Sequence, residues 1–274
     1  AGILLALSSP VYSPQVIAVQ GDEVKTEFRV NEVTTNSQLN SSIAMDADGD
    51  FVIAWQSRGQ DPDGDSYGIF AQRYSADGST VGSEFLVNTE TSNAQENPSI
   101  AMDADGDFVI AWDSYHAGSG VYAQRYTADG IVAGGEFLVN TVTSNASNPS
   151  IAMDADGDFV IAWQSVDGEA NNDIYAKRYT ADGSPVGTEL PVNTVTAHDQ
   201  RFPSIAMDAD GDFVIAWESF SEDVLGTWGV FAQRYTADGI KAGIEGFLVN
   251  TETSNNQRGS SVAMDADGDF VIAW

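Results

Sequence analysis

One block of twelve residues, AMDADGDFVIAW, occurs five times in this chain of 274 residues without a single change. The copies span Ala44–Trp55, Ala101–Trp112, Ala152–Trp163, Ala206–Trp217 and Ala263–Trp274. Two further blocks recur between the copies, and their first examples are IFAQRYSADG at Ile69–Gly78 and EFLVNT at Glu84–Thr89. Repeats of roughly 50 residues are typical of proteins built from one small unit, so this feature constrains the fold more than any other.

Each recurring block has the pattern of a β-strand or a tight turn. FVIAW is short, β-branched and aromatic and has no polar residue, which predicts a strand buried on both faces. IFAQRY and FLVN mix apolar and polar residues, as outer strands do. DADGD and ADG combine a glycine, which accepts a positive φ, with aspartates that bond to nearby backbone amides. The chain therefore reads as all-β, with no sustained helical period.

One repeat then contains four antiparallel strands (SIAM, FVIAW, IYAQRY and FLVN), which is typical of a propeller blade. The first hairpin occurs five times and the second four times, but Gln15–Asn31 supplies a fifth, since Glu27–Asn31 matches Glu84–Asn88. We predict a five-bladed β-propeller over residues 11–274, its last blade closed two-plus-two by the N- and C-terminal hairpins. Exchange of the terminal hairpin between chains is the alternative. Residues 1–10 are predicted to be an extension, either a docking segment or a signal remnant.

The order SIAMDADGDFVIAW, IYAQRYTADG, EFLVN resembles NHL-type propeller repeats, and more closely the repetitive propeller arrays of bacterial surface and secreted proteins. The resemblance covers about residues 11–274 and implies a propeller and a secreted or cell-surface location in bacteria, but little about function. NHL-type repeats usually carry Asn after the turn glycine. This chain departs from that pattern with an aspartate there in every copy: Asp50, Asp107, Asp158, Asp212 and Asp269.

The charge balance excludes some partners. The chain carries 41 acidic and 11 basic residues, a formal charge of −30, which repels phosphate backbones and argues against nucleic acid. There is no cysteine, so neither a disulfide framework nor a thiol nucleophile is available. No apolar run approaches the roughly 20 residues of a transmembrane helix.

The acidic turns are candidate calcium sites. In DADGD the aspartates stand at i, i+2 and i+4, a usual spacing for oxygen ligands, but the following FVIAW supplies no closing carboxylate. We favour a turn in which Asp side chains cap backbone amides, with weak Ca²⁺ binding as the alternative and no other cofactor required. A second acidic loop spans Gln60–Asp65. The candidate ligands are Asp46, Asp48, Asp50, Asp61, Asp63, Asp65, Asp103, Asp105, Asp107, Asp154, Asp156, Asp158, Asp208, Asp210, Asp212, Asp265, Asp267 and Asp269.

The loops that do not repeat should lie at the opposite end of the propeller, where ligands usually bind. They contain five candidate ligand-binding residues: Tyr67, Tyr115, His116, Phe220 and Trp228. Exposed aromatic rings among Asn, Asp and Gln residues are suited to sugars, because a flat apolar platform and planar hydrogen-bonding groups are both present.

Catalysis is disfavoured at this stage. Only His116 and His198 are available as imidazole bases, and most acidic residues stand in near-identical turns, whereas an active site needs differently tuned carboxylates. We therefore predict a non-enzymatic extracellular scaffold, structural or adhesive, that self-associates into an oligomer or filament or binds a cell-surface protein or glycan through its loops and N-terminal segment. A lectin-like carbohydrate-binding propeller is the alternative, and a glycosidase-like enzyme is the third and least favoured reading.

Overall fold

A computed structural model of the chain describes residues 2–6, 15–20, 23–24, 27–64, 66–116, 119–141, 144–166, 171–222 and 226–274. Within these ranges the chain forms strands β1 to β22 and no helix. No described segment could therefore cross a membrane as a long apolar helix. The all-β prediction is confirmed.

Four of the sheets are complete units of four antiparallel strands, which we call blades 1 to 4. Blade 1 contains β5 (Gln38–Met45), β6 (Phe51–Arg58), β7 (Tyr67–Tyr74) and β8 (Thr80–Leu86). Blade 2 contains β9 (Gln95–Met102), β10 (Phe108–Ser114), β11 (Gly120–Tyr126) and β12 (Phe137–Leu138). Blade 3 contains β13 (Ser144–Met153), β14 (Phe159–Val166), β15 (Asn172–Tyr179) and β16 (Pro185–Pro191). Blade 4 contains β17 (Gln200–Met207), β18 (Phe213–Phe220), β19 (Trp228–Tyr235) and β20 (Lys241–Leu248).

The two ends of the chain form separate sheets. At the C-terminal end, β21 (Ser261–Met264) pairs with β22 (Phe270–Ala273). At the N-terminal end, β2 (Gln15–Gln20) pairs with β1 (Gly2–Ala6) on one edge and with β3 (Glu23–Val24) and β4 (Phe28–Arg29) on the other. The predicted pairing of the terminal hairpins into one closed blade is thus not present in this structure, because β1 lies beside β2. Of the predicted extension, Gly2–Ala6 form β1, while residues 1 and 7–10 lie outside the described ranges; its role as a docking segment or signal remnant stays a prediction.

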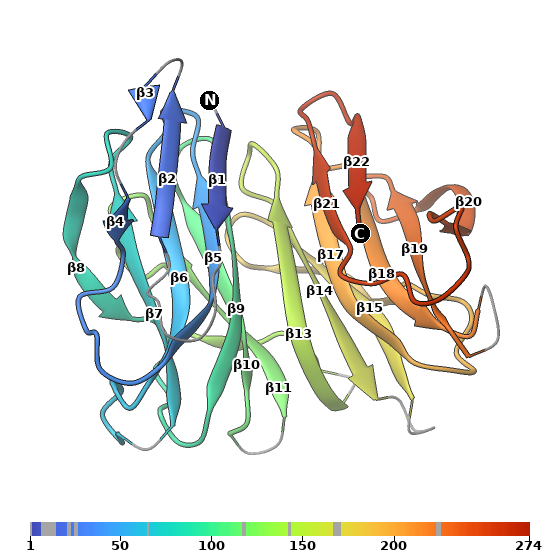
Figure 1. Cartoon of the computed structure of the whole chain (residues 1–274), viewed down its shortest axis with the longest axis horizontal. Coiled ribbons are helices and arrows are strands. Elements are labelled where there is room, and N and C mark those ends of the chain that lie inside the picture. Colours follow the sequence, from blue (N-terminus) through green and yellow to red (C-terminus); the bar gives the residue numbers. More distant parts are fainter. Residues whose placement is uncertain are drawn as a thin grey trace.

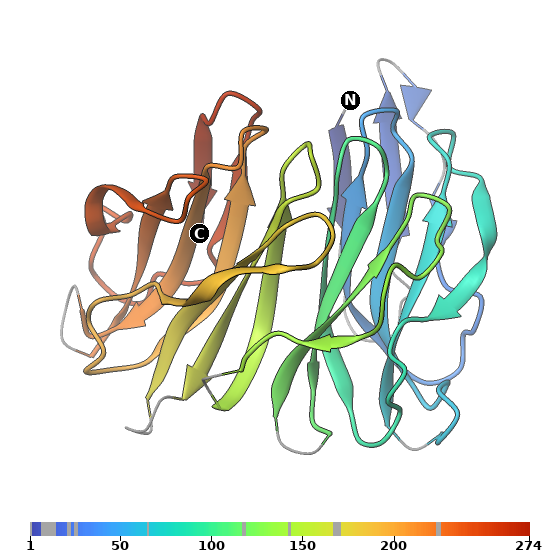
Figure 2. The ribbon, with the colours of Figure 1, turned by 180° about the vertical axis from the view of Figure 1, so that it is seen from behind.

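The sheets follow one another around a central axis, and the first strands of consecutive blades, β5, β9, β13, β17 and β21, contact one another in that order. Figure 2 shows the sheets in unbroken succession at the back of the molecule. In Figure 1 the N-terminal strands (blue) and the β21–β22 hairpin (red) face the viewer on either side of an opening. The repeated sheets agree with a propeller, seen here as a ring that is open at one place.

The apolar core lies between neighbouring sheets. In blades 1 to 4 the second strand is the FVIAW segment, and its tryptophan is at most 1% exposed in every case (Trp55, Trp112, Trp163 and Trp217). Each apolar cluster combines residues of two consecutive blades, for example Ile110 with Val52, and Trp163 with Val109. The predicted burial of FVIAW on both faces is confirmed for these four copies.

Repeated residues also join the blades by repeated polar contacts. Ser42 Oγ in blade 1 accepts a hydrogen bond from the backbone N–H of Ile100 in blade 2, at 3.2 Å. The same contact recurs from Ser99 to Ile151, from Ser150 to Ile205 and from Ser204 to Val262. Farther out, Arg73 donates two hydrogen bonds of 2.6 Å to carbonyl oxygens in the ADG turn of blade 2. Each blade is therefore joined to the next by the same kind of contact from the repeated serine.

Candidate functional site

The DADGD turns cluster at one end of the ring, which we call the turn face. In blade 2, Asp103 Oδ1 accepts hydrogen bonds from the backbone N–H groups of Asp105 (3.0 Å) and Asp107 (2.9 Å). Asp107 Oδ1 accepts from the N–H of Ala128 at 2.8 Å, which ties this turn to the ADG turn of the same blade. The same bonds recur in the other complete blades. The first and third aspartates thus act as turn caps.

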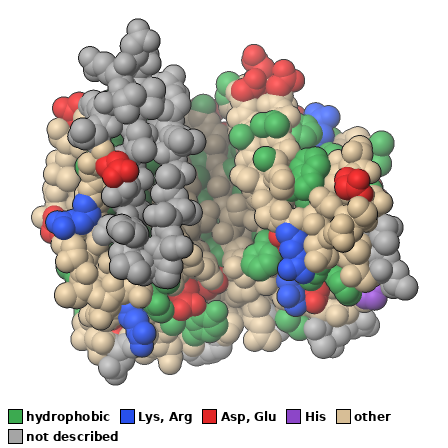
Figure 3. Space-filling model, in the orientation of Figure 1, with side chains coloured by type: hydrophobic (Ala, Val, Ile, Leu, Met, Phe, Trp, Pro, Cys, Tyr) green, Lys and Arg blue, Asp and Glu red, His purple; other side chains and the backbone are tan. Residues whose placement is uncertain are grey.

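The carboxylates of the turn face do not converge on a metal site. Among the described residues, no group of three or more His, Asp or Glu side chains could hold a metal ion. A pocket of about 180 Å³ does open between the turns of blades 2 and 3, lined by Asp103, Asp105, Asp156 and Arg125. Calcium binding at the DADGD turns stays a prediction that these contacts do not test. Figure 3 shows acidic side chains (red) at the top of the molecule, above the β21–β22 hairpin.

The second acidic loop has a different geometry. Asp61 is buried, and its backbone carbonyl accepts a hydrogen bond from Gly64 at 3.1 Å, which closes a turn. Asp63 lies in this turn with further interactions of its own. Asp65 lies outside the described residues.

At the opposite end, the loop face, one position recurs in every complete blade. It is the residue directly after FVIAW: Gln56, Asp113, Gln164 or Glu218. Each side chain is buried and accepts a hydrogen bond from a backbone N–H of the next sheet's first strand or, for Glu218, of Gly259 just before β21, at 2.7–3.0 Å. The acceptor is an amide in blades 1 and 3 but a carboxylate in blades 2 and 4. The loop face therefore has two buried carboxyl groups at a position that elsewhere carries glutamine.

Asp113 and Glu96 form a pair of carboxyl groups in blade 2. They lie directly opposite each other on β10 and β9, where side chains share one face of the sheet. Asp113 is 2% exposed, and burial raises its pKa to about 7, although hydrogen bonds from Asn97 and Asn148 oppose the rise. The negative charge of Glu96 adds to it. Glu96 is half-buried, and burial raises the pKa of its carboxyl as well. Near neutral pH the pair holds a proton that isolated carboxyl groups would have lost.

Tyr115 completes this cluster at the surface. Its side chain is 44% exposed, and its pKa is raised by burial and then by the charges of Asp113 and Glu96. The hydroxyl thus senses the charges of both carboxyl groups while part of the side chain remains accessible. Tyr115, one of the five predicted ligand-binding residues, therefore feels the charges of two carboxyl groups whose own pKa values are raised.

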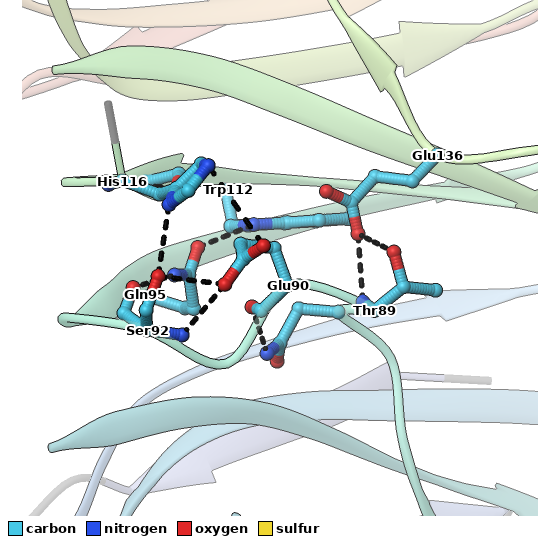
Figure 4. A network of polar contacts seen from close by, with 9 residues as sticks. Thr89, Glu90, Ser92, Gln95, Trp112, His116 and Glu136 are labelled. Carbon is cyan, nitrogen blue, oxygen red and sulfur yellow. Dashed lines mark hydrogen bonds and ion pairs between the residues drawn. The ribbon is translucent and has the colours of Figure 1, made fainter. Parts of the chain in front are cut away.

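His116, the next residue, belongs to a separate polar network (Figure 4). Its Nδ1 is 2.8 Å from Ser92 Oγ, and its Nε2 is 3.8 Å from the carboxylate of Glu90. Hydrogen bonds from Ser92 lower the pKa of Glu90. In the same view, Gln95 accepts a hydrogen bond from Trp112 Nε1 at 3.2 Å. The network fixes the connection into β9, the strand that carries Glu96.

Phe220 and Trp228 contact each other in blade 4, with ring centroids 5.2 Å apart. Trp228 is only 8% exposed, because the guanidinium groups of Arg258 and Arg201 lie 4.6 and 5.5 Å from its ring centre. It therefore offers no open face to a sugar in this structure. Tyr67 lies half-buried in blade 1, opposite Arg58. The predicted aromatic residues thus come from three different blades rather than from one platform.

Sequence reasoning missed Glu96 and Asp113. The signal was present: in the segments that lead into SIAM and out of FVIAW, blade 2 has carboxyl groups at both of these positions, whereas blade 1 has Leu39 and Gln56. The repeated aspartates stand in identical turns, whereas Glu96 and Asp113 stand at positions that vary between blades. A site that occurs once in the molecule is expected at positions that vary.

Comparison with known proteins gives fold relatives only. No protein-family model and no curated protein sequence matches the chain. Among solved structures, an ulvan lyase of a polysaccharide lyase family aligns with a TM-score of 0.62 and 12% identity, over 96% of this chain and 72% of that one. The α-L-arabinanase of Penicillium chrysogenum in complex with arabinobiose aligns with a TM-score of 0.59 and 13% identity, over 86% and 74%. A thermostable family-43 glycoside hydrolase aligns with a TM-score of 0.51 and 16% identity, over 92% of both chains.

At these identities the similarity shows the fold alone, a propeller-like array of four-stranded antiparallel sheets. The neighbours are nevertheless carbohydrate-active enzymes, and they contradict the prediction of a non-enzymatic structural or adhesive scaffold. That prediction rested on the absence of differently tuned carboxyl groups, and the Asp113–Glu96 pair supplies such groups. The NHL-type resemblance, which no family model supports, remains a prediction.

Proposed function

We propose that this protein is a carbohydrate-active enzyme of the glycoside hydrolase type, with Glu96 as its acid–base residue and the buried Asp113 as the residue that positions it. One observation carries the proposal: a buried carboxyl group whose pKa is raised to about 7 lies directly across the sheet from an accessible one. Glycosidic bonds are broken by two carboxyl groups that hold different protonation states at the same pH. By their names, the solved structures with a similar fold include an arabinanase and an ulvan lyase.

In the proposed reaction Glu96 contacts the substrate, because it is the half-buried member of the pair. Its protonated carboxyl group gives its proton to the oxygen of the leaving sugar while the bond to the anomeric carbon breaks. A water molecule then adds its oxygen to that carbon and returns a proton to the carboxylate. Burial raises the pKa of the Glu96 carboxyl, which favours the protonated form that donates. Asp113, held by hydrogen bonds from Asn97 (2.8 Å) and Asn148 (2.8 Å), positions Glu96 from across the sheet.

The ring of Tyr115 would support a sugar beside this pair, since an aromatic face packs against the C–H groups of a pyranose or furanose. The proposal also includes a five-bladed propeller as the active form, completed by the terminal hairpins, and an extracellular location where polysaccharides are found. The NHL-type resemblance supports the propeller architecture of this proposal and not its reaction.

The test is release of reducing sugar from a panel of arabinan, xylan and other polysaccharides, with UV absorbance as the readout for an eliminating lyase. Glu96→Gln should lower the rate by about 100-fold or more, the usual contribution of a positioned acid or base. Asp113→Asn should displace the alkaline limb of the pH profile, where Glu96 loses the proton that it donates. Glu252→Gln, an exposed carboxylate on another loop-face connection, is the matched control and should leave the rate unchanged.

Carbohydrate binding without turnover is the second candidate, favoured by the exposed ring of Tyr115. The two are separated by glycan binding measured alongside hydrolysis. Binding that survives Glu96→Gln while turnover is lost supports the enzyme. Binding by the unmodified protein without any product would reject it in favour of a lectin-like role.

A further inference from the structure

The last copy of the repeated block is the one that lacks its usual surroundings. In the first four copies the FVIAW residues are at most 6% exposed, whereas Val271 is 66% and Trp274 49% exposed. The twelve residues are identical in all five copies, so the difference lies in the neighbours and not in the sequence. Within the described residues β22 is hydrogen-bonded to β21 alone, while every other FVIAW strand has a partner on each edge.

The register of the N-terminal sheet identifies the missing partner. On β2, Val16 faces Phe28 of β4, just as Ala71 on β7 faces Phe85 of β8 in blade 1. Val16 therefore holds the position that Ala71 holds in blade 1. Ala71 also faces Ala54, the fourth residue of FVIAW, on its other edge.

In the fifth copy the residue equivalent to Ala54 is Ala273, which should face Val16. In this structure Leu5 of β1 faces Val16 instead. The pairing runs antiparallel from Gly2 opposite Val19 to Ala6 opposite Gln15, so β1 covers the same five register positions that FVIAW would cover.

Both halves of the fifth blade are already docked on their neighbours. On one side, Tyr74 Oη donates to the carbonyl of Val30 at 3.0 Å, the contact that Tyr126 makes with Val87 at the next boundary. On the other side, Ser204 Oγ accepts from the N–H of Val262 at 3.1 Å. In the series of serine-to-backbone contacts between neighbouring sheets, the next one around the ring would join Ser261 to the N–H of Ile43. Ser261 is instead exposed in this structure.

We propose that the free edge of β22 is a docking surface for β2 of the same chain, and that β1 and β22 compete for one edge of β2. When β22 binds, β1 is displaced, the fifth blade contains β21, β22, β2 and β4, and the ring closes. When β1 binds, the ring is open as seen here. The inference rests on backbone register and on contacts between blades, and it is independent of the proposed chemistry.

The absence of native cysteine allows a direct test by disulfide cross-linking of the full chain. The variant Val16→Cys with Ala273→Cys reports the closed ring, and Val16→Cys with Leu5→Cys reports the open one. Directly opposed residues of antiparallel strands lie within disulfide reach. Ala54→Cys with Ala71→Cys is the positive control, because this equivalent pair is opposed within blade 1. Val16→Cys with Val271→Cys, two residues out of register, is the negative control.

After oxidation with diamide, non-reducing electrophoresis and mass spectrometry give the products. We expect an intrachain disulfide between positions 16 and 273, and a severalfold higher yield when Leu4→Pro weakens the pairing of β1. Two results would overturn the inference. One is cross-linking to position 5 alone, even with Leu4→Pro. The other is a covalent dimer through positions 16 and 273, which would assign the edge of β22 to a second copy.

Discussion

At the scale of single residues, Asp113 shows how one departure from a repeat changes local chemistry. Gln56 and Gln164 hold the same position and accept the same backbone hydrogen bond without a titratable group. Aspartate at that position keeps the acceptor but brings a carboxyl group into a site with 2% exposure. Because burial disfavours the charged form, the site gains a group that titrates near neutrality.

The stability of the protein should record this titration. The carboxyl of Asp113 has a pKa of about 7 in the folded chain, against an ordinary value of 3.8 for an aspartate in water. Between these values the unfolded chain has lost a proton that the folded chain keeps, so this residue lowers stability as pH rises through that window and adds no further loss above it. Asp113→Asn should therefore leave the free energy of unfolding unchanged near pH 3.8 and raise it by about 2–4 kcal/mol above pH 7.

Urea unfolding of both proteins across that pH range measures the difference. Asp105→Asn, an exposed carboxylate on the turn face, is the control and should show no pH-dependent gain. A constant difference between Asp113→Asn and the parent at all pH values would contradict the assignment of the raised pKa to Asp113.

At the scale of elements, the hairpins could be predicted from sequence because their signals are local. DADGD gives both the glycine with positive φ and the capping carboxylate, and FVIAW has the composition of a buried strand. The partner of β2 was not predictable in the same way. The segments GILLA and FVIAW are both apolar and strand-forming. The residue pattern therefore does not show which of the two pairs with the edge of β2.

The candidate site was harder to predict than the fold for a related reason. Glu96 and Asp113 are 17 positions apart, and only the antiparallel register of β9 and β10 brings them opposite each other. The raised pKa values arise from burial, which residue spacing does not report. Tyr115 was predicted as a ligand-binding residue from its loop position, but its neighbours were not.

The turn caps give a prediction at this same scale. Asp103→Ala removes the acceptor of two backbone N–H groups and should destabilise the protein by about 1–2 kcal/mol, as loss of a capping side chain does in helices. Asp105→Ala, the middle aspartate of the same turn, is exposed and should change the free energy of unfolding by less than about 0.5 kcal/mol. Denaturant unfolding distinguishes the two. Equal effects would mean that the turn gains nothing from the Asp103 side chain.

At the scale of the whole molecule, the formal charge of −30 is distributed unevenly. Every complete blade and the β21–β22 hairpin present a DADGD turn on the same face. In each complete blade, the third aspartate of DADGD also accepts a hydrogen bond from the ADG turn on that face. Like charges on one face repel one another and oppose the compact state. The same repeat that gives the ring its regular contacts therefore also gathers mutually repelling carboxylates at the turn face.

This arrangement predicts how cations affect stability. Salt should raise the melting temperature, because counter-ions screen repulsion between exposed carboxylates. At matched ionic strength, CaCl₂ should stabilise no more than MgCl₂, since the first and third aspartates of each turn already accept backbone N–H groups and no described cluster offers three convergent ligands.

The measurement is thermal unfolding in NaCl, MgCl₂ and CaCl₂, with and without chelator. A calcium-specific rise that chelator reverses would contradict this expectation, because a ligand bound to the native state must raise its stability. Asp105→Asn combined with Asp156→Asn would then test the pocket between blades 2 and 3 as the place where the ion binds.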